Sequence, residues 1–206
     1  TMKLLPLSLL FASLLPSLPA AMADDALTGL PYAINSSMID GHALSGSRGR
    51  NVVNMAAGDA NAQQNAAAIA LSPNGNASIG LFTQQNLHQN SSTSPGMSVS
   101  GIGGNAFTNT MGALSINQTS GTGNAQVNGM AIGIGLDVDV MSENMLSNMS
   151  TGAGLAAREP DDGTRSATIA DSAFTGSRGL VQVNQSAGSG NSTANNFVLQ
   201  IELGTK

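Results

Sequence analysis

Cysteine and tryptophan are absent from this chain, and other aromatic or charged side chains are scarce. Without cysteine there is no disulfide framework, no thiolate metal site and no cysteine nucleophile. Five Phe and one Tyr in 206 residues are too few for an ordinary large globular core, because aromatic side chains dominate burial in such cores. Only seven residues are Lys or Arg, which argues against nucleic-acid binding, since that needs a basic face carrying aromatic side chains.

Small and amide side chains take the place of the missing types. The chain holds 25 Gly, 20 Asn and 10 Gln, and its apolar content is 41%. Charged residues make up 9% of the chain and the net charge is -5, which does not fit the highly charged kind of disorder. This composition favours repetition and close stacking of strands.

The first 23 residues have the layout of a secretory signal peptide. Lys3 precedes an apolar run over residues 4–18, and an Ala-x-Ala cleavage pattern ends at Ala23. The run is shorter than the roughly 20 residues that a membrane-spanning helix needs. We therefore expect a signal peptide and a mature protein that is exported.

An internal repeat is the dominant feature of the sequence. Segments 39–71, 102–134 and 169–201 align without a gap, a match that is improbable by chance even in this composition. Seven columns are identical in all three copies: Ile39/Ile102/Ile169, Ala43/Ala106/Ala173, Gly49/Gly112/Gly179, Asn54/Asn117/Asn184, Gly58/Gly121/Gly188, Asn61/Asn124/Asn191 and Asn65/Asn128/Asn195.

The repeats divide the chain into eight parts. The linkers are interrupted by Gly, Ser and Pro, so we expect them to be irregular, although residues 77–87 of linker 1 can add a strand. The parts are the signal peptide 1–23, a lead segment 24–38, repeat 1 at 39–71, linker 1 at 72–101, repeat 2 at 102–134, linker 2 at 135–168, repeat 3 at 169–201 and a tail at 202–206.

Each repeat is predicted to form a strand, a turn and a second strand, with a shorter strand before Gly49, Gly112 and Gly179. In the third copy, side chains alternate with period two over residues 181–186 and 192–201, which is typical of β-strands. The turn between them is rich in Gly and Asn, which tolerate a positive φ. The predicted turn residues are Gly58, Asn61, Gly121, Asn124, Gly188 and Asn191.

Two arrangements of this unit are possible. A hairpin pairs the two strands of one repeat, whereas a β-arch faces their side chains together and pairs each strand with the next repeat. Abundant Asn explains the turn column, but Asn is normally depleted in mid-strand. Stacked amides about 4.8 Å apart satisfy one another, and a lone buried amide does not. We therefore predict an all-β, cross-β-like stack of β-arches, or β-solenoid, with ladders at Asn54, Asn117, Asn184, Asn65, Asn128, Asn195, Gln118 and Gln185.

No group of residues has the pattern of a catalytic or metal site. His42 and His88 are the only histidines, and Asp137, Asp139 and the 161–163 loop lack the full spacing of a calcium loop. No Gly-x-Ser-x-Gly motif stands in a strand-to-helix context. We expect no enzyme activity, no cofactor, no metal, no small-molecule substrate and no nucleic acid partner.

The repeats resemble those of secreted bacterial functional amyloids of the Fap family. Residues 53–65 (VNMAAGDANAQQN) and their two later copies carry the resemblance, and residues 117–118 and 123–126 are similar, more distantly, to curlin repeats. The resemblance implies a bacterial protein that is secreted through the periplasm and an outer-membrane pore to the cell surface or the extracellular space. There it implies assembly, with related subunits, into fibrils that support biofilm and adhesion. Fap fibril subunits carry Cys-x-Cys near the C-terminus and this chain has no Cys, which leaves open whether it is the main subunit or an accessory.

The leading hypothesis is a self-assembling structural subunit of an extracellular amyloid-like fibre. Low charge, β-prone stretches and in-register amides are typical of cross-β assembly, and a stack of three repeats leaves open edges. The alternative is a monomeric β-solenoid adhesin or surface-binding module with capped ends.

Overall fold

The computed structural model describes residues 34–85, 96–144 and 163–203, all within one compact unit, Tyr32–Lys206. Each range forms one layer of three strands, and no described residue is helical. Layer 1 holds β1 (Ile34–Ile39), β2 (Arg48–Ala57) and β3 (Ala62–Thr83); layer 2 holds β4 (Met97–Ile102), β5 (Met111–Ser120) and β6 (Ala125–Asn144); layer 3 holds β7 (Thr164–Ile169), β8 (Arg178–Ala187) and β9 (Ser192–Glu202).

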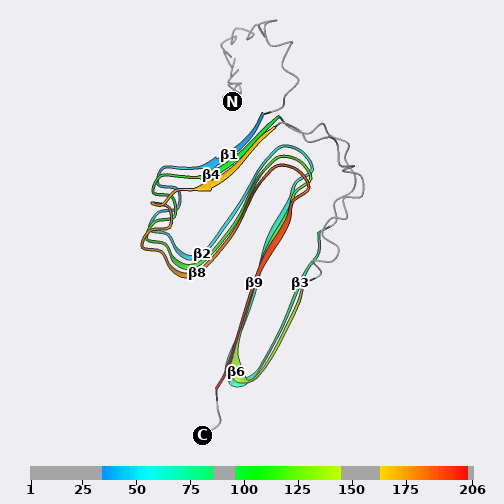
Figure 1. The fold of residues 1–206 in the computed structure, drawn as a ribbon. Coiled ribbons are helices and arrows are strands. Elements are labelled where there is room, and N and C mark those ends of the chain that lie inside the picture. Colours follow the sequence, from blue (N-terminus) through cyan, green and yellow to red (C-terminus); the bar gives the residue numbers. More distant parts are fainter. Residues whose placement is uncertain (1–33, 86–95, 145–162, 204–206) are drawn as a thin grey trace, which may run out of the picture. The chain divides into compact units, whose positions relative to one another are not determined.

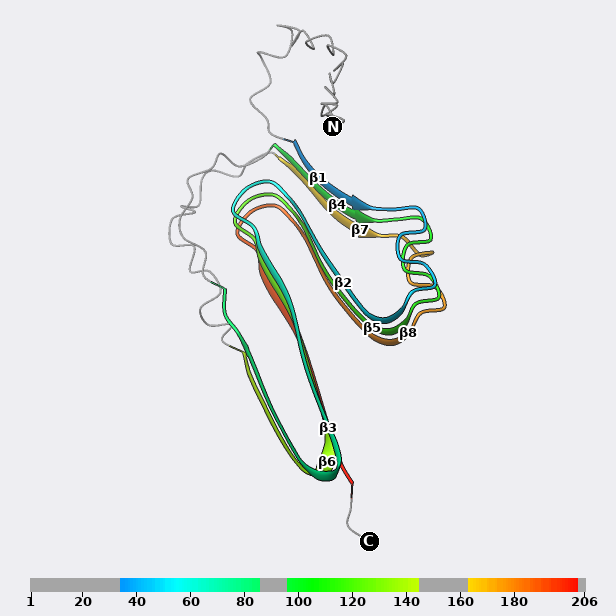
Figure 2. The same ribbon diagram turned by 180° about the vertical axis from the view of Figure 1, so that it is seen from behind.

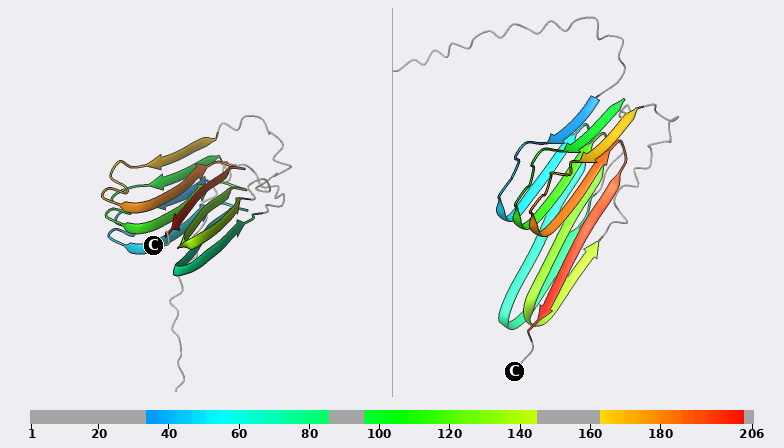
Figure 3. Two further views of the ribbon diagram at one scale, coloured as in Figure 1. Left: turned by 90° about the horizontal axis from the view of Figure 1, so that it is seen from below. Right: turned by 60° about the vertical axis from the view of Figure 1, so that its left-hand side comes forward.

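The hydrogen-bonded neighbours of every strand lie in other layers. Three parallel sheets result, with the strand orders β1-β4-β7, β2-β5-β8 and β3-β6-β9. Figure 1 shows the three layers following the same path, and Figure 3 shows them stacked one above another. The prediction of an all-β stack of arches, rather than separate hairpins, is confirmed.

The register of the sheets is that of the ungapped alignment. Gly49 pairs with Gly112 and Gly112 with Gly179, and the mid-strand Asn columns pair in the same way. The layers are longer than the repeats, however. β1, β4 and β7 lie mostly in the lead segment and the two linkers, and β3 and β6 continue into the linkers. Parts of both linkers are therefore regular strands. The strand that residues 77–87 were expected to allow is present up to Thr83, whereas the other strands of the linkers lie where we expected irregular chain.

β3 and β6 each reverse direction partway. Their pairing is interrupted between Ser72 and Asn76, and Figures 1 and 2 show both strands bending there and running back. We call residues 76–83 of β3 and 137–144 of β6 the returning segment. Gln85 follows this segment in layer 1, and its Nε2 donates to the Gln126 carbonyl at 3.1 Å, at the beginning of β6.

The returning segment occurs in two of the three layers, and side-chain size explains the difference. It packs beside a part of β3 and β6 where three successive positions of one face hold only Ala or Gly; a Cβ on Gly129 would lie 3.3 Å from Leu81 of the segment. Layer 3 has larger side chains at these positions and, in the described residues, no returning segment. The three columns are Ala66/Gly129/Asn196, Ala68/Ala131/Val198 and Ala70/Gly133/Gln200.

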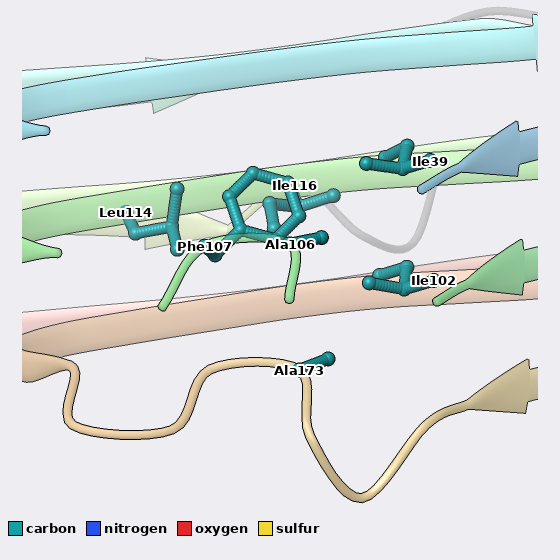
Figure 4. Close-up of a cluster of buried hydrophobic side chains, with 7 residues drawn as sticks. All are labelled: Ile39, Ile102, Ala106, Phe107, Leu114, Ile116 and Ala173. Atoms are coloured by element: carbon teal, nitrogen blue, oxygen red, sulfur yellow. The ribbon is translucent and has the colours of Figure 1, made fainter. Parts of the chain in front are cut away.

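The main apolar core lies between the second strands and the bends that precede them. Its buried members, drawn in Figure 4, come from all three layers: Ile39, Ile102, Ala106, Phe107, Leu114, Ile116 and Ala173. The rings of Phe107 and Phe174 stack with their centroids 5.2 Å apart and their planes 12° apart. Full burial of one such side chain contributes roughly 1.5–3 kcal/mol to stability.

The bends at residues 40–47, 103–110 and 170–177 are also stacked in register. Phe107 N–H donates to the Ala43 carbonyl at 2.8 Å, and Phe174 N–H to the Ala106 carbonyl at 3.0 Å. The residue after the invariant Ala has a positive φ in every layer: 53° at Leu44, 58° at Phe107 and 63° at Phe174. Large residues rarely adopt this conformation, and here core packing of the two Phe rings offsets its cost.

Candidate assembly site

The second strands carry the first column of stacked amides. Asn117 Nδ2 donates to Asn54 Oδ1 at 3.1 Å, and Asn184 Nδ2 donates to Asn117 Oδ1 at 3.0 Å. The same two amides also donate to carbonyls of the third strands, at Gln64 (2.8 Å) and Val127 (2.9 Å). The column therefore joins the layers to one another and the two sides of each arch.

The third strands carry a second column, which faces the first inside the arch. Asn128 Nδ2 donates to Asn65 Oδ1 at 2.8 Å, and Asn195 Nδ2 donates to Asn128 Oδ1 at 3.0 Å. Within each layer the third-strand amide also donates to the second-strand amide, at 2.6 Å from Asn65 to Asn54 and at 2.9 Å in the other two layers. The six predicted Asn side chains thus lie together in one hydrogen-bonded network.

The interior of the arch is polar beyond these six side chains. Gln126 Nε2 donates to the Gln118 carbonyl at 3.0 Å and to Ser186 Oγ at 3.1 Å, and the hydroxyls of Thr119 and Ser186 are 2.8 Å apart. Asn117, Asn128 and Gln126 are all fully buried. Buried polar groups are costly when unpaired, whereas a network in which every amide donates holds the strands in one register.

Gln118 and Gln185 lie on the opposite face of the second strands, toward the first strands. Gln185 Nε2 donates to Gln118 Oε1 at 3.1 Å, and Gln118 Nε2 donates to the carbonyls of Ser37 (2.8 Å) and Gly101 (2.9 Å). Layer 1 has Met55 in this column. These two residues therefore belong to a separate contact, between the second and first strands, and not to the arch interior.

The predicted turn residues also form a column of stacked amides. Asn124 Nδ2 donates to Asn61 Oδ1 at 2.9 Å, and Asn191 Nδ2 donates to Asn124 Oδ1 at 2.8 Å. The backbone N–H groups of Asn124 and Asn191 donate to the same oxygens, at 3.0 Å each. Sequence reasoning assigned this column to turn geometry alone; its identity in three copies was the available sign of a ladder.

The glycines of the turn are required by close stacking of the backbone. Gly58, Gly121 and Gly188 have φ values of 99°, 123° and 110°. A Cβ on Gly121 would overlap the Gly188 carbonyl, and one on Gly58 would overlap the Gly121 carbonyl. The Gly49/Gly112/Gly179 column, which we had not assigned to the site, has the same property, because a Cβ on Gly112 would overlap the Gly49 carbonyl.

The outer faces of layers 1 and 3 differ from the covered middle layer. Most of β5 and of the first half of β6 is buried, whereas Asn54 in layer 1 is exposed and Asn65 is half-buried. In all three Asn columns, Nδ2 of the higher-numbered layer donates to Oδ1 of the layer before it. The stack therefore has a direction, and its two outer faces are not equivalent.

One charged side chain lies across the outer face of layer 1. Arg50 Nη2 donates to the Asn65 carbonyl at 3.3 Å. The Gln64 carbonyl accepts from Asn117 in layer 2. Because successive carbonyls along a strand point to opposite sides, the Asn65 carbonyl points out of the stack. Arg50 thus covers an unpaired edge group, as charged side chains often do at sheet edges.

The other candidates from the sequence do not come together. His42 is exposed in the first bend, and Asp137 and Asp139 are exposed on the returning segment. His88, residues 161–162 and the predicted signal peptide lie outside the described residues. Across residues 34–85, 96–144 and 163–203, no cluster of His, Asp and Glu could hold a metal ion. In those same ranges no helix has the length and apolar character to cross a membrane.

Comparison with known protein families identifies a relationship that covers most of the chain. A family model described as the functional amyloid protein FapB/FapC family matches residues 20–202, which is most of the chain. No solved structure matches. The resemblance to the Fap family that the repeats indicate is therefore confirmed.

Proposed function

The chain belongs to the functional amyloid protein FapB/FapC family, and on that premise we propose that it is a structural subunit, or an accessory, of an extracellular amyloid-like fibre. Copies add end to end by in-register stacking, layer 3 of one copy against layer 1 of the next. The fibre supports biofilm and adhesion, and it includes related subunits. The predicted signal peptide and an outer-membrane pore deliver the chain to the cell surface.

The observation that carries this proposal is the set of amide columns with one direction of donation. A second copy placed on layer 3 brings Asn54, Asn61 and Asn65 next to Asn184, Asn191 and Asn195. Each column then continues with the same Nδ2-to-Oδ1 contact that joins the layers within one copy. Each hydrogen bond between two side-chain amides contributes about 1 kcal/mol to the stability of the junction. Fibre growth therefore uses contacts that the chain already makes.

The columns that surround the amides also continue across such a junction. Gly179 meets Gly49 and Val183 meets Val53, and in the bends Ala173 meets Ala43. The invariant columns of the arch therefore continue across the junction with the same side chains that stack within one copy. An exposed sheet edge with these properties is a template for adding another chain.

Fibre diffraction and thioflavin fluorescence of the purified protein test the proposal. We expect a meridional reflection near 4.8 Å, the spacing of stacked strands, and a rise in fluorescence after a lag. A combined Asn65→Asp/Asn128→Asp/Asn195→Asp variant is expected to abolish or strongly delay both, because stacked carboxylates repel. A wild-type protein that stays monodisperse and never acquires the reflection overturns the proposal. An unchanged lag in the variant overturns the role of the ladder.

One contact favours a second candidate, the monomeric β-solenoid adhesin. Arg50 covers the open edge of layer 1, as expected of a stack whose ends are protected. Sedimentation of the wild-type protein separates the two functions, because the adhesin stays a monomer at concentrations at which the fibre subunit assembles.

A further inference from the structure

The third strands carry an apolar face that the described residues leave uncovered. The second strand of each layer curves away from the lower half of the third strand (Figures 1 and 2). Beyond that point, the face that carries the Asn column continues with aliphatic side chains. They form two columns, Ile69/Ile132/Leu199 and Leu71/Ile134/Ile201, which we call the aliphatic stripe.

Part of the exposure of the stripe is lateral and does not come from the open ends of the stack. Ile69 and Leu71 are 64% and 67% exposed in layer 1, and Leu199 and Ile201 are 37% and 38% exposed in layer 3. Ile132 and Ile134 are only half-buried in layer 2, which has a layer on each side, although neighbouring Asn128 in the same strand is fully buried. Adding copies at the two ends would therefore reduce the exposure of these side chains but not remove it.

The stripe is also free of charge and of polar groups. Its positions are occupied by Ile and Leu in all three layers. Glu202 and Gln200 lie on the opposite face of β9, where they contact each other at 3.1 Å. That opposite face is filled by the returning segment in layers 1 and 2 and by larger side chains in layer 3. Only one face of this sheet thus remains apolar and bare.

We propose that the aliphatic stripe is the surface along which two stacks of this chain pair face to face. The inference rests on the proposed function, because it requires stacks. In a stack the two columns become continuous, with one aliphatic side chain in each column every 4.7–4.9 Å or so. A second stack of the same chain has apolar side chains at that same period, so every layer finds an identical partner at the usual sheet-to-sheet distance of about 10 Å.

The size of the stripe explains why pairing follows stacking. A specific interface uses roughly 20–30 residues from each partner, and a single copy offers six. Two single copies therefore do not pair stably, whereas stacks of several copies do, because each added copy extends the same surface. A two-fold axis parallel to the stacks gives both stacks the same direction and the same contacts.

Mass per length of fibres, measured by dark-field electron microscopy, tests this pairing. Three layers span about 14 Å, so a paired fibre holds two chains in that length and a single stack holds one. The variant Ile69→Thr/Ile132→Thr/Leu199→Thr places β-branched side chains, which suit a strand, at all three positions and adds hydroxyls to the stripe. We expect its mass per length to fall by half while the reflection near 4.8 Å is retained.

The matched control places the same substitutions on another exposed apolar surface. Ile34, Met38 and Met97 are exposed on the first strands, and their combined change to Thr is expected to leave two chains in each length of about 14 Å. One chain in that length for the wild-type protein overturns the pairing while leaving the stacking intact. Two chains for the stripe variant also overturn it, because pairing then uses another face. A wild-type protein without the reflection overturns the proposed function itself, and with it the pairing.

Single cysteines give a readout that does not depend on the triple variant. The chain has no Cys, and Ile132→Cys or Ile134→Cys places one thiol on the stripe. In layer 2 the thiol has Ile or Leu above and below it in the same column. We expect the thiol to react with a maleimide in the unassembled chain and to be protected in the fibre, where the second stack covers the stripe. A thiol that reacts as fast in the fibre as in the unassembled chain overturns the pairing. Thiols already protected from a maleimide in the unassembled chain also overturn it, because another part of the same chain then covers the stripe.

Discussion

At the scale of single residues, the arch interior uses amides where other folds use apolar side chains. Asn117 and Asn128 are fully buried; both donate to layer 1, and within their own layer Asn128 donates to Asn117. An apolar interior tolerates small shifts between strands, but an amide column loses its partners when a strand moves by one position. The polar interior therefore selects one register and, in a stack of copies, one partner sequence.

Replacement of Asn128 by Asp tests this selection in the middle layer. The carboxylate loses the donor that reaches Asn65, Ile116 and Asn117. We expect the free energy of unfolding to fall by about 3 kcal/mol or more at pH 7, measured by denaturant titration below the concentration at which the chain assembles. Because burial favours the protonated carboxyl, the loss is present at neutral pH and shrinks as the pH falls toward about 4.

Asn196→Asp is the control for this change. It introduces the same charge on the other face of the third strand in layer 3, where Asn196 is exposed. We expect a change within about 0.5 kcal/mol. Equal losses for the two variants would contradict a special role of the buried column.

Arg50 is the residue that most directly opposes assembly. In the two later layers its column holds Ala113 and Leu180, which carry no charge. Arg50→Ala uncovers the Asn65 carbonyl, so we expect faster elongation of seeded fibres, by several-fold, in a thioflavin assay. Arg50→Lys keeps the charge and is expected to stay near the wild-type rate. Slower elongation of the Ala variant would show that Arg50 contributes to the junction instead of covering it.

At the scale of elements, the turn between second and third strands requires backbone stacked directly on backbone. Gly121 and Gly123 both have a positive φ, but only at Gly121 would a Cβ overlap the backbone of layer 3. We expect Gly121→Ala to lower the unfolding free energy by more than about 2 kcal/mol, and Gly123→Ala by about 1 kcal/mol from the left-handed conformation alone. Denaturant titration of both variants checks this, and a similar loss in each would mean that stacking adds nothing at Gly121.

The repeated elements could be predicted from the sequence, whereas outside the repeats the sequence indicated only a possible strand over residues 77–87, without its place in the fold. Three ungapped copies were enough to place Asn54 over Asn117 and Asn65 over Asn128, because identical columns of equal length stack in register. The returning segment lies in the linkers, where no third copy exists and where Pro73, Asn74 and Gly75 suggest an irregular loop. Its physical cause is visible only in the fold: the Ala and Gly columns of β3 and β6 leave room for another strand.

The conformation of the bends at residues 40–47, 103–110 and 170–177 could not be predicted from the sequence. A positive φ at Phe107 or Phe174 goes against the ordinary preference of aromatic residues, and only the stacked rings and the surrounding core explain it. The invariant Ala before each of these residues was noticed as a repeated column, but its burial between layers follows from the path of the bend. Local preference was overridden here by packing between layers.

At the scale of the whole molecule, the junction between copies differs in charge from the junctions within one copy. The first column of the second strands reads Arg48, Met111 and Arg178, so Met111 separates the two arginines inside a copy. Stacked copies bring Arg178 directly beside Arg48. The net charge of -5 adds a general repulsion between copies. Both effects are screened by salt, whose Debye length is about 10 Å at 0.1 M.

We therefore expect elongation to speed up as ionic strength rises from about 0.01 M to 0.15 M, measured with seeded fibres. Arg48→Met removes the like-charge contact and is expected to flatten this dependence. Arg165→Ser removes one positive charge from a column that meets Asn35 across the junction, so it should leave the dependence unchanged. A wild-type rate that is independent of salt would exclude the arginine contact as a barrier.

Because the Asn side chains all have the same orientation, a filament built by the proposed stacking has two chemically different ends. One tip ends in amide hydrogens and carries the Arg50 guanidinium, whereas the other ends in carbonyl oxygens. An arriving molecule thus encounters chemically different surfaces at the two extremities, and nothing requires the two to capture it equally fast. Single filaments followed by microscopy would then elongate mainly at one of their two ends.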